Sequence, residues 1–193
     1  VNDGSTDRTA EICRENGYRL LDLPVNLGLA GCFQAGMKYA YKKGYRYAIQ
    51  FDGDGQHRPE FIDAMRKKMD EGYDIVIGSR FVDSPKDFSP RMVGSRLIAG
   101  AIRLTTGVRI ADPTSGMRMF NREMIQEFAL RLNYGPEPDT ISCLVKQGAR
   151  VAEVAVKIAE RLAGESYLKP RVAVKDMVRV LSSILFIEKF RKR

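Results

Sequence analysis

Residues 45–60 read YRYAIQFDGDGQHRPE, and this stretch indicates how the chain folds. The apolar run over residues 45–51 predicts a buried strand, and the Pro-Glu pair at the end of the stretch suits the first turn of a helix. Asp52 and Asp54 therefore fall at the carboxyl end of a strand, where open α/β sheets bind their ligands. Such hard oxygen ligands suit Mg²⁺ or Mn²⁺ shared with substrate phosphates. An isolated Asp-Gly-Asp sequence is more often a solvated turn than a metal-binding loop, so the choice between these two interpretations depends on the rest of the sequence.

Helical and strand patterns alternate along the 193 residues, and glycines close several of the helices. Helices are expected at residues 7–16, 29–43, 59–71, 91–106, 122–132 and 139–147, and strands at residues 19–23, 45–51, 74–77, 116–120 and 150–156. This alternation predicts an α/β fold with a mainly parallel sheet covered by helices on both faces. The 44% hydrophobic content is enough for one domain with a sizeable core, which we place at residues 1–166.

Residues 167–193 differ from the rest because they predict a basic amphipathic helix. Lysines and arginines accompany the apolar positions and end the chain as Arg191-Lys192-Arg193. Such a helix can lie in the interface of an anionic membrane. Alternatively, the apolar stripe docks on this domain or on a dimer partner and leaves the basic end solvated. The apolar positions are Val174, Met177, Val178, Leu181, Ile184 and Leu185.

Six motifs follow one another along the chain. They are NDGSTD at residues 2–7, NLGLAG at 26–31, DGDGQHRPE at 52–60, GSRF at 78–81, DPTSGMR at 112–118 and RLAGES at 161–166. In this order they resemble glycosyltransferase family 2, inverting enzymes of the GT-A fold. The resemblance points to the branch that includes dolichyl- and polyprenyl-phosphate sugar transferases. Members of that family begin with a strand, a helix and a second strand before the Asp-Gly-Ser motif, so we interpret this chain as truncated at its amino terminus.

The resemblance implies a donor made of a sugar on a nucleotide diphosphate. A divalent metal would neutralise the charge that grows on the departing phosphate. Asp54 is our first candidate ligand for Mg²⁺ or Mn²⁺, and Asp52 either shares the ion or contacts the ribose. By resemblance, Asp3 contacts the nucleotide base.

Two further features accompany these acids. The glycine-rich loop with Asn26 and Gly28 lets the backbone approach a phosphate or ribose, although a plain helix entry explains it equally well. His57 is the only histidine. It either contacts the metal or diphosphate, or is a water-exposed residue at the start of a helix.

The acceptor side is assigned to residues 112–118 by resemblance. The segment reads as a turn leading into a strand, in which Ser115 and Gly116 permit a tight backbone and Arg118 can present a planar fork to an anion. The alternative is a Pro-containing turn with a surface arginine. Arg161 is a further candidate clamp on phosphate, from a loop that could close over the site.

The acceptor decides whether the site needs a base. A sugar hydroxyl must lose a proton, and Asp112, Glu137 and Asp139 are the candidate bases. A lipid phosphate needs none, because its second ionisation lies near about 6. The arginines and the basic tail favour polyprenyl phosphate. The alternatives are transfer to a saccharide hydroxyl in cell-surface polysaccharide synthesis and a non-catalytic, membrane-associated module that binds nucleotide-sugars.

Composition narrows the range of partners. The net charge of +8 suggests an anionic partner, such as a nucleotide-sugar, a membrane surface or a nucleic acid. Nucleic acid is the weakest of these, because no helix-turn-helix, zinc finger or RNA-binding strand pattern occurs. The cysteines Cys13, Cys32 and Cys143 are far apart and odd in number, which favours reduced thiols and a cytoplasmic setting, either free or at the cytoplasmic face of the membrane. No signal peptide is visible, and no apolar run is long enough for a membrane span.

Overall fold

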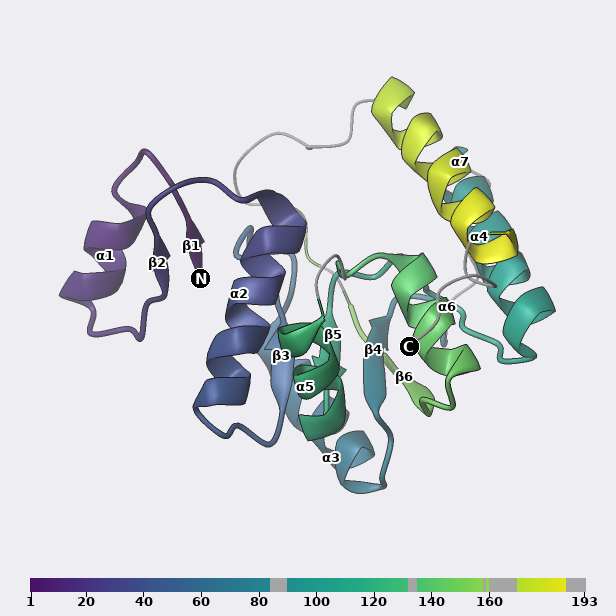
Figure 1. Ribbon diagram of the computed structural model, residues 1–193, viewed down its shortest axis with the longest axis horizontal. Coiled ribbons are helices and arrows are strands. Elements are labelled where there is room, and N and C mark those ends of the chain that lie inside the picture. Colours follow the sequence, from purple (N-terminus) through teal and green to yellow (C-terminus); the bar gives the residue numbers. More distant parts are fainter. Residues whose placement is uncertain (84–89, 132–134, 158, 160–169, 187–193) are drawn as a thin grey trace. The chain divides into compact units, whose positions relative to one another are not determined.

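The computed structural model describes residues 1–83, 90–131, 135–157, 159 and 170–186 (Figure 1). The chain divides into two compact units. The first comprises residues Val1–Ala48 and Arg122–Pro136, and the second comprises Ile49–Asn121 and Glu137–Arg193.

The described residues of the first unit form two very short strands and three helices. They are β1 (Asn2–Asp3), α1 (Thr9–Glu15), β2 (Asp22–Leu23), α2 (Gly28–Lys42) and α5 (Arg122–Leu130). The strands pair in parallel, so that Asp3 lies opposite Leu23 at the carboxyl end of β1. Helices α2 and α5 pack against each other, and the rings of Phe33 and Phe128 meet edge to face with 4.9 Å between centroids. This contact joins segments about ninety residues apart in the chain.

The second unit carries the main sheet. Its elements are η1 (Pro59–Phe61), α3 (Ile62–Asp70), β4 (Ile75–Ser79), α4 (Pro90–Thr106), β5 (Arg118–Phe120), α6 (Pro138–Lys146), β6 (Val151–Ala155) and α7 (Pro170–Leu185), and β3 (Ala48–Gln50) leads into it. The strand order is β3-β5-β4-β6. Strand β4 is buried along its whole length, as expected for a central strand covered on both faces.

The predicted α/β alternation is confirmed, but the sheet is more mixed than expected. Strand β4 runs parallel to β6 and antiparallel to β5. Because β5 runs against β4, its first residue Arg118 pairs with Ile77 near the carboxyl end of β4. The turn that precedes β5 therefore arrives at the edge where β4 and β6 end. The strand propensity of residues 116–120 does not reveal whether β5 runs parallel or antiparallel to β4, because that depends on the segment that connects the two strands.

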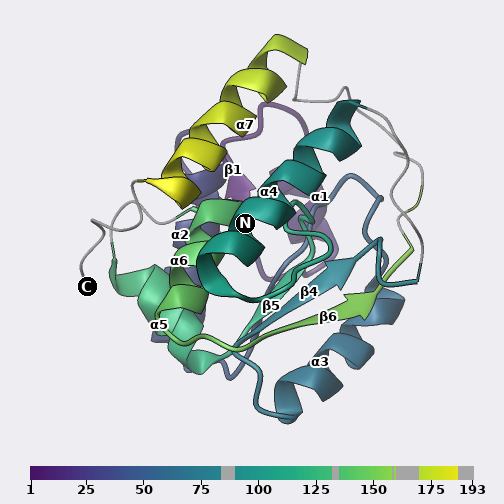
Figure 2. The same cartoon turned by 90° about the vertical axis from the view of Figure 1, so that its right-hand side faces the viewer.

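The predicted carboxyl-terminal helix is present as α7, which packs against α4 and α6 (Figure 2). Val180 and Ile184 are buried, and the hydroxyl of Ser183 donates a 2.6 Å hydrogen bond to Oδ2 of Asp139 at the start of α6. Part of the predicted apolar stripe thus docks on this unit, as the alternative interpretation expected. Another part, which includes Val174 and Val178, stays exposed. The terminal basic cluster 191–193 lies outside the described residues.

Candidate functional site

The Asp-Gly-Asp loop follows β3 and is tied together by its own polar groups. The backbone N–H of Asp52 donates to Nδ1 of His57 at 2.9 Å, and the backbone N–H of Gln56 donates to Oδ1 of Asp54 at 3.0 Å. His57 is only 7% exposed, so it is not the water-exposed residue of one sequence interpretation. The side chain of Asp52, by contrast, belongs to an exposed residue. The loop therefore exposes the Asp52 carboxylate on a backbone that the buried imidazole of His57 holds in place.

Gly116 brings the loop and the 112–118 segment together. A Cβ atom on Gly116 would lie 2.8 Å from Oδ2 of Asp52 and 3.2 Å from Cε1 of His57. Real Cβ atoms do not approach other atoms this closely, so the missing side chain is what lets the Asp52 carboxylate rest against this turn. Two predicted motifs about sixty residues apart in the sequence thus form one site.

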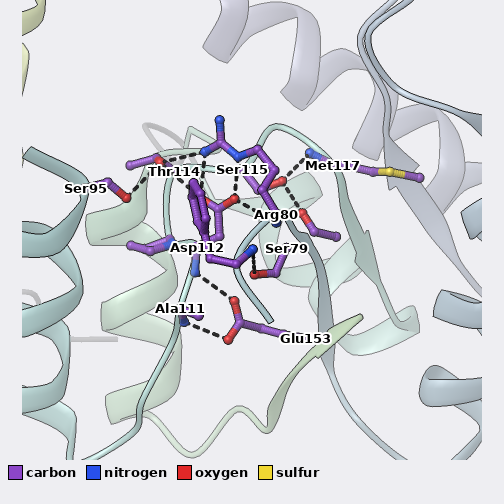
Figure 3. A network of polar contacts seen from close by, with 12 residues as sticks. Ser79, Arg80, Ser95, Ala111, Asp112, Thr114, Ser115, Met117 and Glu153 are labelled. Carbon is purple, nitrogen blue, oxygen red and sulfur yellow. Dashed lines mark hydrogen bonds and ion pairs between the residues drawn. The ribbon is translucent and has the colours of Figure 1, made fainter. Parts of the chain in front are cut away.

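Asp112 is the centre of the polar network behind this turn (Figure 3). Its carboxylate is fully buried and receives Nε of Arg80 at 2.6 Å and Nη2 at 2.8 Å, a bidentate ion pair. The hydroxyl of Thr114 and the backbone N–H of Arg80 also donate to it. Burial alone would raise the pKa of Asp112, but the hydrogen bonds and charge of Arg80 outweigh it and hold the pKa below the ordinary 3.8.

Glu153 supports the same turn from β6. Its two carboxylate oxygens accept the backbone N–H groups of Ala111 at 2.7 Å and Asp112 at 2.8 Å (Figure 3). On the other side, the buried hydroxyl of Ser115 donates to the carbonyl of Gly78 and accepts the N–H of Met117. The predicted acceptor residue Ser115 therefore uses its side chain to fasten the turn to β4.

Arg118 faces the interior. It is 2% exposed, and Nη2 donates to the carbonyl of Pro113 at 2.7 Å. Burial lowers its pKa to about 10, and the charges of Asp112, Glu137 and Asp52 limit this fall. The guanidinium stays positive at neutral pH, but the interpretation as a surface arginine on a turn is wrong. From its buried position beneath the turn, the positive charge of Arg118 acts on the carboxylates of Asp112, Glu137 and Asp52.

The candidate bases have different surroundings. Asp112 is committed to Arg80, and Asp139 is buried and accepts from Ser183. Glu137 is half-buried at the amino-terminal cap of α6 and makes no side-chain hydrogen bond to the helix start. The depressed pKa of Asp112 makes this carboxylate a poor proton acceptor.

The predicted donor residues of the first unit also lie together. Oδ1 of Asp3 accepts the backbone N–H of Leu27 at 2.7 Å, and the Asn26 amide donates to the backbone carbonyl of Asp3 at 3.0 Å. Oδ1 of Asn26 then accepts the N–H of Gly28 at 3.1 Å. These bonds join the NDGSTD and NLGLAG motifs at the entry to α2, so a plain helix entry accounts for part of their pattern.

The donor set suits a hard divalent cation that is shared with a substrate. Among the residues that the structure describes, no three His, Cys, Asp or Glu side chains gather in a way that could hold a metal ion. Mg²⁺ is usually bound by one or two carboxylates together with substrate phosphates and water, and this loop carries two carboxylates, Asp52 and Asp54. Arg161, the second predicted phosphate clamp, lies outside the described residues.

Arg80 and Glu153 are site residues that sequence reasoning did not assign. Arg80 was visible in the GSRF motif, but nothing in the sequence connects it to an acid thirty-two residues away. Glu153 left a clearer signal, since a single charge interrupts the apolar strand VAEVAV at residues 151–156. A carboxylate in such a strand requires buried donors, and the turn at 111–112 supplies them.

Comparison with known proteins places the chain among sugar transferases. The family model described as Glycosyl transferase family 2 matches residues 1–128. Polyprenol monophosphomannose synthase of Mycolicibacterium smegmatis is 28% identical over 86% of this chain and 68% of its own length. Undecaprenyl-phosphate mannosyltransferase of Micrococcus luteus is 27% identical over 93% and 79%, and dolichyl-phosphate hexose transferase of Haloferax volcanii is 29% identical over 87% and 72%.

Replacing Gly116 with alanine should displace the Asp52 carboxylate. We expect Gly116→Ala to weaken Mn²⁺ binding about tenfold, as losses of supporting contacts at metal sites commonly do. Water-proton relaxation can measure this affinity. Gly100→Ala is the matched control, because a Cβ there meets nothing within 4 Å. Equal Mn²⁺ affinity in Gly116→Ala and the unchanged protein would contradict the placement of Asp52.

Removing Arg80 should destabilise the protein by leaving the Asp112 charge buried and unpaired. We expect Arg80→Ala to cost about 3 kcal/mol at neutral pH, measured by urea unfolding. In the unchanged protein, the depressed pKa of Asp112 stabilises the fold at any pH above the ordinary pKa of 3.8. This stabilisation is lost as the pH falls through the lower pKa of the folded state. In the variant, burial acts without Arg80 and raises that pKa.

The stability deficit of Arg80→Ala should therefore shrink in mildly acidic solution, where the variant protonates Asp112. Arg66→Ala, which breaks exposed ion pairs on α3, should change stability little at either pH. A deficit for Arg80→Ala that does not depend on pH would show that Asp112 is not the group left unpaired.

Proposed function

Because the chain belongs to glycosyl transferase family 2, we propose that this glycosyltransferase moves a sugar from a nucleotide-diphosphate donor to a polyprenyl phosphate. Membership implies the GT-A fold, and the observed α/β architecture agrees with it. The observation that carries the proposal is the junction at Gly116, where the Asp-Gly-Asp loop meets the 112–118 turn. The names of three relatives mention a polyprenol, undecaprenyl phosphate and dolichyl phosphate, which supports a polyprenyl phosphate as the acceptor of this chain.

On the donor side, Asp54 and Asp52 would hold Mg²⁺ or Mn²⁺. When bound, such an ion neutralises charge on the diphosphate. Asp3, Asn26 and Gly28 would hold the nucleotide at the entry to α2, where backbone amides and short side chains can approach it. The bond between the anomeric carbon and the diphosphate oxygen breaks as an acceptor oxygen attacks from the opposite face, which inverts the anomeric centre.

On the acceptor side, the contacts favour a nucleophile that is already anionic. Asp112 is held ionised by Arg80, and Asp139 is engaged by Ser183, so neither is arranged as a free base. A phosphomonoester needs no base, because it is substantially dianionic above about pH 6. Ser115 and Arg118 would shape the acceptor side from within the turn, and Arg161 remains a predicted clamp on the phosphate.

Helices α4 and α7 together offer a surface for contact with a membrane. Val93, Leu97 and Leu104 recur on one face of α4 and are 45%, 50% and 80% exposed. On the neighbouring α7, Val174 and Val178 are also exposed. Exposed Arg103, Lys175 and Arg179 lie on the same two helices, and their charge suits anionic lipid. No helix in the described part of the chain is long and apolar enough to cross a bilayer. We infer that these helices rest in the interface.

Loss of the metal ligand should abolish transfer. Asp54→Ala, or a chelator added to the unchanged protein, should reduce release of nucleoside diphosphate by at least about a hundredfold. The assay supplies nucleotide-sugars, Mg²⁺ or Mn²⁺, and either polyprenyl phosphate or simple saccharides. Asp63→Ala, an exposed acid on α3, is the matched control. Full turnover in chelator would refute the metal role, and turnover on saccharides alone would refute the lipid acceptor.

Charge placed on the α4–α7 surface should weaken membrane binding. Leu97→Asp should lower affinity for vesicles of mixed phosphatidylcholine and phosphatidylglycerol about tenfold, since burying a leucine contributes roughly 1.5–3 kcal/mol. High salt should weaken binding of the unchanged protein as well. Leu130→Asp removes a similarly exposed leucine from α5 and should leave vesicle binding intact. Co-sedimentation with vesicles measures the binding of both variants. Equal losses of vesicle binding in Leu97→Asp and Leu130→Asp would show that the α4–α7 surface is not the membrane contact.

A further inference from the structure

His57 is buried beneath the Asp-Gly-Asp loop and is bonded to its backbone. The N–H of Asp52 points at Nδ1 across 2.9 Å. A nitrogen that accepts a hydrogen bond carries no hydrogen, so the neutral ring carries its hydrogen on Nε2. The bond spans five residues and closes the loop 52–57 into a ring. The imidazole therefore determines the backbone direction at the first acid of the pair.

The ring is held on two further sides. Its centroid lies 5.5 Å from that of Phe51 in an edge-to-face arrangement, and Cε1 lies 3.2 Å from the position of a Cβ on Gly116. Phe51 precedes Asp52 in the chain, and Gly116 is the residue on which the Asp52 carboxylate rests. His57 thus packs against Phe51, lies beside Gly116 and accepts a hydrogen bond from the Asp52 amide. A side chain used in this way has little freedom to reach a ligand.

We propose that His57 is a positioning residue that aims the Asp52 carboxylate by holding the backbone of that residue. This inference rests on the proposed function, because it assigns His57 a part in donor binding through Asp52. It replaces the sequence expectation that His57 itself touches the metal or the diphosphate. The essential property is an acceptor at the Nδ1 position, and a general base or a positive charge at residue 57 is not required.

The hydrogen bond can be tested without any ligand. Because His57 is the only histidine, its imidazole signals in a long-range ¹H–¹⁵N spectrum are free of overlap. The proposal expects the Nε2–H tautomer at neutral pH, together with slow solvent exchange of the Asp52 amide. An Nδ1–H tautomer, or an Asp52 amide that exchanges as fast as an unbonded one, would overturn it.

Two amide substitutions separate the role of Nδ1 from that of Nε2. In His57→Asn the side-chain oxygen can lie near the Nδ1 position, whereas in His57→Gln it reaches toward the Nε2 position. We expect His57→Asn to keep slow exchange at Asp52 and most of the turnover. We expect His57→Gln to lose the slow exchange and about tenfold to a hundredfold in Mn²⁺ affinity and turnover. The reverse order of the two variants would overturn the proposal.

Several outcomes remain distinguishable from failure of the proposed function. If the unchanged protein transfers no sugar, the proposed function fails, while the tautomer and the Asp52 exchange rate still decide the role of His57. If both variants unfold in circular dichroism, the tautomer of the unchanged protein decides it. If both fold and retain slow exchange but lose turnover, His57 touches the donor directly and the positioning role is wrong.

Discussion

The ion pair between Arg80 and Asp112 is the contact on which the turn at residues 112–118 depends. A fully buried carboxylate is tolerated only when charge and hydrogen bonds replace the water it has lost. Here the guanidinium supplies two of those bonds, and the backbone and Thr114 supply more. Glu153 then fixes the peptide that carries Asp112. A turn that would otherwise be a mobile surface loop is thereby built like part of the core.

The direction of one strand explains why that turn sits beside the Asp-Gly-Asp loop. Parallel strands alone would deliver only their carboxyl ends to the ligand-binding edge of the sheet. Strand β5 runs the other way, so the residues before it come to that edge as well. Gly116 then leaves room for Asp52. The Asp-Gly-Asp loop and the turn at residues 112–118 can meet because the sheet is mixed.

Much of the fold was predictable because periodicity and capping are local properties. Helices and strands occur close to the expected residues, and the Asp-Gly-Asp loop follows a strand as expected. The reversal of β5 was missed, because strand direction depends on connections that leave little local trace. For the same reason the burial of Arg118 was missed: the sequence interpretations made it either an anion-binding fork or a surface residue, whereas the turn folds it inward. Arg80 and Glu153 were missed because each gains its role only from a partner distant in the chain.

The bond between Ser183 and Asp139 ties helix α7, which carries the exposed Val174 and Val178, to the interior of the second unit. Asp139 stands in the first turn of α6, two residues after Glu137, whose charge acts on Arg118. Any displacement of α7 must either break this bond or carry the first turn of α6 with it. The charges around the buried Arg118 are therefore mechanically linked to how α7 is seated, so that the position of α7 and the electrostatics behind the turn at residues 112–118 are not independent properties of this unit.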